Sequence, residues 1–92
     1  MTYHRERHLA DLPRLILSEG AQIAYDLQSS SLPRRQRALD SLERYARVEL
    51  DRLTRNPSSW VACQTTYNAL ASIWNAEREL LKAERLWTHR AA

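Results

Sequence analysis

The chain has 92 residues, of which 43% are hydrophobic and 27% are charged. A chain of this length makes one small domain with a modest core and leaves little room for a substrate-sized cavity. No segment approaches the roughly 18 to 20 continuous apolar residues of a membrane span, and the polar N-terminus lacks the apolar core of a secretion signal. We therefore expect a cytoplasmic protein that does not act in a membrane.

The composition is typical of a helical protein, with one Gly, three Pro and no run that alternates polar and apolar residues over a strand's length. We predict an all-α fold. The net charge of +3 permits an acidic partner without requiring one. The single cysteine, Cys63, excludes an intrachain disulfide and lies in an apolar pattern, so we interpret it as a small buried hydrophobic residue.

The first predicted helix spans about residues 12–28, with Asp11 as its N-cap and Pro13 in its first turn. Residues 1–10 are polar and form either an arm or a short helix. Gly20 lies on the apolar face of the 12–28 helix, and because the apolar spacing continues in phase past it, we expect a close approach of another helix rather than a break. That apolar face is formed by Leu12, Ile16, Gly20, Ile23 and Leu27.

The second predicted helix spans about residues 32–55. It follows the serine loop at 29–31 and ends before Pro57, because proline disfavours helix at the residue before it. Its predicted buried stripe consists of Leu39, Leu42, Ala46, Leu50 and Leu53.

The third predicted helix spans about residues 58–90, and the stretch from Ser59 to Arg90 contains neither Gly nor Pro. Two apolar seams run along it, which predicts a central helix that packs on both sides. We define the first seam as Ala62, Thr66, Ala69, Ile73, Ala76, Leu80, Ala83 and Trp87. We define the second seam as Cys63, Tyr67, Leu70, Trp74 and Leu81.

Short loops between successive helices predict an up-down-up antiparallel bundle of three helices. The third helix is longer than the second, so antiparallel pairing exhausts the second helix near Leu81 and leaves about ten residues projecting. We predict that this apolar end, with Leu80, Leu86 and Trp87, binds a foreign protein or a second copy of the chain. Residues 1–10 are not expected to cover it, since the start of the first helix should lie at the other end of the bundle. Tyr25, on the opposite side of its helix from the apolar face, is a further exposed candidate for partner binding.

An arginine stripe on the second helix is the other candidate surface, formed by Arg34, Arg37, Arg44, Arg52 and Arg55. Carboxylates four residues earlier predict ion pairs from Asp40 to Arg44 and from Asp51 to Arg55, which are typical of a solvated face. The arginines near the helix start, however, lie at the positive end of the helix dipole, where carboxylates would be stabilising. The stripe is therefore either a solvated face or a surface for an acidic patch of a protein or for nucleic acid phosphates.

Two groups of polar residues give weaker signals. His4 and His8 have the spacing of a helical metal pair, but the pattern lacks a third ligand and we predict no metal site and no cofactor. Glu77 and Glu84 are seven residues apart, too far along a helix to share a proton, so we predict that they form structural ion pairs with arginines such as Arg35.

No catalytic motif is present, and we predict a non-enzymatic protein. Helical chorismate mutases are similar in size and in helix length, but their active site requires arginines inside the bundle, and these arginines are predicted to face outward. In size and style the chain resembles small helical proteins of phages and mobile elements, including some anti-CRISPR inhibitors. That resemblance implies an inhibitor or adaptor that binds a protein partner, with nucleic acid binding through the arginine stripe as the alternative.

Overall fold

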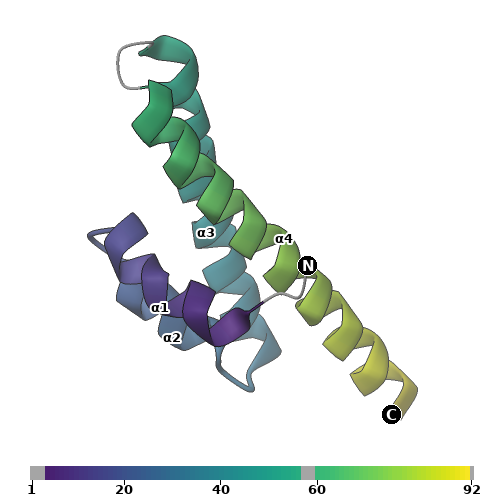
Figure 1. Cartoon of the computed structure of the whole chain (residues 1–92). Helices are drawn as coiled ribbons and strands as arrows, with labels where there is room; N and C mark the ends of the chain where they lie inside the picture. Colours follow the sequence, from purple (N-terminus) through teal and green to yellow (C-terminus); the bar gives the residue numbers. More distant parts are fainter. Residues whose placement is uncertain (1–3, 57–59, 92) are drawn as a thin grey trace.

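The structure, a computed structural model, describes residues 4–56 and 60–91, with side chains up to Thr88. These residues form helices only, which confirms the all-α prediction, and there are four of them in the described ranges rather than three (Figure 1). They are α1 (Arg5–Leu15), α2 (Gly20–Leu27), α3 (Leu32–Arg55) and α4 (Trp60–Ala91).

The prediction of one helix over residues 12–28 was wrong. The segment is divided between α1 and α2, because the chain leaves helical geometry at Ile16, which is extended, and resumes it at Gly20. Pro13 does not start a helix but lies in the last turns of α1. The apolar residues were nevertheless assigned to the correct side, since Leu12, Ile16 and Ile23 are all buried. The apolar residues of two helices joined by a sharp reversal can therefore have the same sequence spacing as the apolar face of one continuous helix.

Gly20 permits this reversal because it lies directly against the backbone of α1. A Cβ built at Gly20 would lie 2.2 Å from the carbonyl oxygen of Leu12 and 2.7 Å from the Cα of Pro13. The expected close approach is therefore present, but it occurs between two halves of what the sequence suggested was one helix. Only glycine fits at this crossing.

α3 and α4 form a long hairpin whose helices lie side by side in opposite directions, and the α1–α2 hairpin packs against its lower half (Figure 1). α3 has the bounds expected from the sequence. Ser31 caps its N-terminus by accepting a hydrogen bond from the Arg34 N–H at 3.4 Å. The adjacent Pro33 fits there because no intrahelical N–H is required in the first turn. Pro57, expected to end α3, lies outside the described residues.

The core lies where the two hairpins meet. The second seam faces it: Cys63, Leu70 and Leu81 are buried, as expected, and Tyr67 and Trp74 are partly buried. The first seam does not have a second full packing partner, since only Ile73 is buried and the seam is exposed from Leu80 onward. The predicted buried apolar stripe of α3 is confirmed at Leu39, Leu42 and Ala46. It was wrong at Leu50, which is 40% exposed, because α1 and α2 do not extend that far along α3.

The C-terminal part of α4 projects from the body, as the helix lengths predicted. Among the side chains of α4 that the structure describes, Leu81 is the last that is buried, and residues 82–88 are all exposed. The molecule measures 52 × 23 × 22 Å, and a helix of 32 residues is about 48 Å long, so α4 spans nearly the whole long axis. Of the helices in the described residues, none is long and apolar enough to cross a bilayer.

Candidate functional site

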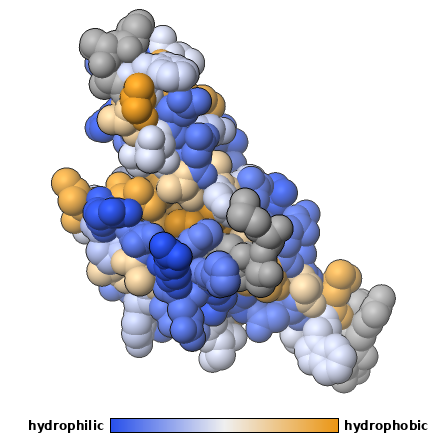
Figure 2. All heavy atoms as spheres, in the orientation of Figure 1, coloured by the Kyte–Doolittle hydropathy of each residue, from blue (hydrophilic) through white to orange (hydrophobic). Residues whose placement is uncertain are grey.

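The projecting end of α4, residues 82–88, exposes large apolar side chains. Trp87 is 74% exposed and Leu86 is 59% exposed, while Leu80 at the base of the projection is 39% exposed. In Figure 2 hydrophobic atoms appear at this projecting end, whereas most of the surrounding surface is hydrophilic. Apolar side chains of this size at the tip of a helix favour a role in binding.

A hollow of about 590 Å³ lies at the base of the projection, and we call it the notch. Its volume is in the range of pockets that bind ligands or side chains. One wall is the apolar side of α4, and the others come from the start of α1, the loop between α2 and α3, and the first turn of α3. The lining residues are Arg5, Gln28, Ser29, Ser30, Arg35, Leu80, Ala83, Glu84 and Trp87.

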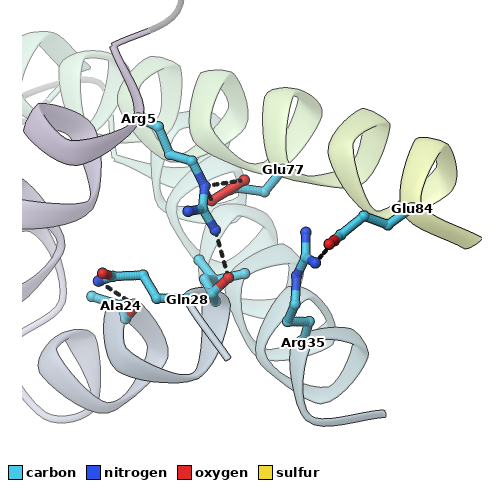
Figure 3. A network of polar contacts seen from close by, with 7 residues as sticks. Arg5, Ala24, Gln28, Arg35, Glu77 and Glu84 are labelled. Atoms are coloured by element: carbon cyan, nitrogen blue, oxygen red, sulfur yellow. Dashed lines mark hydrogen bonds and ion pairs between the residues drawn. The ribbon is translucent and has the colours of Figure 1, made fainter. Parts of the chain in front are cut away.

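Arg5 connects three helices at the edge of the notch (Figure 3). Its Nε donates to both carboxylate oxygens of Glu77, at 2.9 and 3.2 Å, and its Nη2 donates to the carbonyl oxygen of Leu27 at 2.6 Å. Glu77 is only 1% exposed, and burial raises its pKa, although the neighbouring Arg5 and Arg35 guanidiniums act in the opposite direction. A buried carboxylate of this kind requires its cation.

Arg35 is the second buried charge of the notch, with 6% of its surface exposed. It forms an ion pair with Glu84 from the next helix (Figure 3). Burial lowers the pKa of Arg35, Arg5 lowers it further, and Glu77 raises it. The predicted structural ion pairs of Glu77 and Glu84 are thus confirmed, with Arg35 as the partner of Glu84.

The arginine stripe of α3 is largely neutralised. Arg52 and Arg55 pair with Glu49 and Asp51, at 3.3 and 3.1 Å. The spacing predicted an ion pair between Arg44 and Asp40, but Arg44 lies 3.7 Å from Glu19 instead. The reversal between α1 and α2 brings Glu19 beside it.

The arginines in the first turns of α3, which lie at the positive end of the helix dipole, have carboxylate partners on other helices. Arg34 lies 3.8 Å from Asp26 of α2, and Arg35 has Glu84. For Arg37 no ion pair is found within the described part of the chain. The five arginines of the stripe are exposed and most of them are paired, so the stripe has less free positive charge than the sequence pattern suggested.

The remaining predicted residues are not brought together with the notch. Tyr25 is 64% exposed on α2, where it lines a separate hollow with Arg34 and the 28–30 loop. His4 is exposed and His8 is half-buried, while the side chain of His89 is outside the described residues. Within the described ranges no group of three or more His, Cys, Asp or Glu residues is arranged to hold a metal ion.

The contribution of α1 to the notch was missed from the sequence. The start of the first helix was placed at the far end of the bundle, but the reversal at residues 16–19 returns it to Glu77. The signal was the combination of Pro13 with Gly20, which together indicate a break. The start of α1 still leaves Leu86 and Trp87 exposed, so the projecting end lacks intramolecular cover from the described residues.

No protein-family model matches the chain, and no match was found among curated proteins or among solved structures.

Proposed function

We propose that this protein acts without catalysis, by binding a protein partner through the projecting end of α4 and the notch beside it, as an inhibitor or adaptor of a larger assembly. The observation that carries the proposal is the exposure of Trp87, Leu86 and Leu80 on a helix end that extends beyond the core. Tryptophan is enriched among the residues that contribute most to protein interfaces.

A second copy of the chain is the simplest alternative occupant of the apolar end. Light scattering distinguishes the two cases at micromolar concentration. Binding of a foreign protein predicts a solution mass close to the chain's 10.8 kDa, and self-association predicts twice that mass.

Affinity capture from extracts of the native host tests the proposal, with the wild-type chain compared with Trp87→Ala. We expect Trp87→Ala to lose the captured protein, because its indole is accessible and contributes nothing to the core. Trp60→Ala is the matched control, since Trp60 is 48% exposed at the other end of α4 and its loss should leave capture unchanged. Equal capture by all three chains would contradict the proposal.

The arginine stripe of α3 is not the surface that we propose for partner binding. Most of its positive charge is already paired, so a phosphate backbone would have to compete with intramolecular carboxylates at Arg44, Arg52 and Arg55. For this reason nucleic acid binding remains the weaker alternative.

A further inference from the structure

The two arginines that line the notch, Arg5 and Arg35, differ in which member of their ion pair is buried (Figure 3). Glu77, which holds Arg5, is 1% exposed and lies inside the fold. Glu84, which pairs with Arg35, has a side chain that is 52% exposed, whereas the Arg35 side chain is only 8% exposed. The Arg35–Glu84 pair therefore has a fixed cation and a carboxylate that solvent can reach.

A buried guanidinium needs an anionic neighbour, but that neighbour does not have to come from the same chain. Glu84 can turn into water when another carboxylate takes its place, because its own side chain is already 52% exposed and Arg35 keeps an anionic partner. Its departure would leave Arg35 open to another carboxylate at the floor of the notch. In the Arg5–Glu77 pair the exposures are reversed, since Glu77 is 1% exposed and Arg5 is 37% exposed, so there the carboxylate is the fixed member.

The apolar wall of the notch lies beside this cation. Leu80, Ala83 and Trp87 all line the hollow together with Arg35. A ligand that fits must therefore combine one negative charge with an apolar group next to it.

We propose that the notch binds an aspartate or glutamate side chain of the protein partner, that Arg35 is the residue that anchors it, and that Glu84 occupies the same position in the free protein. An apolar side chain beside that acidic residue would lie on Leu80 and Trp87. This inference rests on the proposed protein-binding function and specifies the chemistry of the partner.

A carboxylate fits this site better than a phosphate group. Its planar pair of oxygens matches the guanidinium of Arg35, and one carboxylate replaces another with no change in the charge of the notch. A phosphate would bring more than one negative charge close to the buried carboxylate of Glu77, and the resulting repulsion opposes its binding.

Benzoate tests this chemistry without knowledge of the partner, since it carries one carboxylate on an apolar ring. We expect titration of the full chain with benzoate to shift the NMR signal of the Trp87 indole N–H, and the neutral analogue benzamide to leave it unchanged. Glu84→Gln should bind benzoate about three- to fivefold more tightly, because it removes a half-exposed competing ion pair.

Glu79→Gln is the matched control. It removes the same charge from an exposed glutamate of α4 that does not line the notch, so it should bind benzoate like the wild type. Equal shifts with benzamide would overturn the inference. So would a failure of Glu84→Gln to bind more tightly than Glu79→Gln.

The source of the carboxylate is tested with two further probes. N-acetyl-glutamyl-leucinamide presents a side-chain carboxylate, and N-acetyl-leucine presents a terminal one. We expect the first to bind more tightly, and binding of the second alone would overturn the assignment to a side chain. Loss of benzoate binding with partner capture intact would remove only this inference, whereas capture that is insensitive to Trp87→Ala would remove the proposed function.

Discussion

The arginines of this protein fall into two groups with opposite environments. Arg5, which is partly exposed, and Arg35, which is buried, come from different helices and converge on carboxylates of α4. The arginine stripe of α3 lies on one helix and faces solvent, where most members pair with nearby carboxylates. The stripe is conspicuous in the sequence but lies in solvent, whereas Arg5 and Arg35 are far apart in the sequence and both line the notch. Regular spacing of charge is therefore a poor guide to which charges matter.

Removal of Arg5 should have the largest effect. Arg5→Ala leaves Glu77 buried without its hydrogen-bonded cation, and we expect a loss of about 3 kcal/mol in the free energy of unfolding at pH 7, measured with urea. The loss should be smaller at pH 4, where Glu77 takes up a proton. Arg14→Ala, in the same helix but exposed, is the control and should cost less than about 0.5 kcal/mol. Equal losses of unfolding free energy in the two variants would contradict a stabilising role of the Arg5–Glu77 pair.

Gly20→Ala tests the reversal that brings Arg5 to Glu77. A methyl group at this position would meet the backbone of Leu12 and Pro13, which cannot move as a flexible side chain can. We expect a loss of about 2 kcal/mol despite the higher helix propensity of alanine, measured by thermal and urea unfolding. Gln22→Ala, two residues further along α2 and exposed, should be nearly neutral. A stabilised Gly20→Ala would instead support one continuous helix over this segment.

Glu77→Gln should change how stability depends on pH. Because burial raises the pKa of Glu77 in the folded state above its unfolded value, its contribution to stability is complete below the unfolded pKa. That contribution is lost as the pH rises through the folded pKa. The wild-type free energy of unfolding, minus that of Glu77→Gln, should thus fall as the pH rises above the ordinary glutamate pKa of about 4.3. A difference that rises with pH would mean that Arg5 more than offsets the cost of burial.

The arginine stripe should give the smallest effects. Arg52→Ala should cost less than about 1 kcal/mol, and less again at high salt, since the Arg52 side chain is 64% exposed in its pair with Glu49. A salt-dependent gel shift with generic DNA and RNA extends the test to binding. If Arg44→Glu combined with Arg52→Glu abolished a specific shift of the wild type, the stripe would be a nucleic acid surface after all.

Much of the fold followed from the sequence, because strong patterns decided it. An uninterrupted run of helix formers predicted α4, and the Ser31–Pro33 start signal with Pro57 predicted α3. The projecting end then followed from the difference in helix length. The reversal between α1 and α2 was missed, since the apolar spacing stays in phase across it and the close contact of Gly20 is tertiary.

The notch could be predicted only in part for the same reason. Leu80 and Trp87 were identified because they lie on one seam of one helix, and Glu84 was matched to Arg35 by its position near the seam. Arg5 was missed because its partners, Glu77 and Leu27, are distant in sequence and meet it only after the chain reverses. The spacing of residues within one helix shows which of them share a face. Which residues of different helices meet in a site depends on how the loops direct the chain.

The central claim is that the projecting end of α4 is a binding surface. Amide hydrogen exchange measured with and without the captured partner tests it most directly, because residues 82–88 lack cover in the free chain. We predict that their exchange slows at least tenfold on binding, while the amides near Trp60 exchange at the same rate. Unchanged exchange at residues 82–88, with protection elsewhere, would contradict the claim.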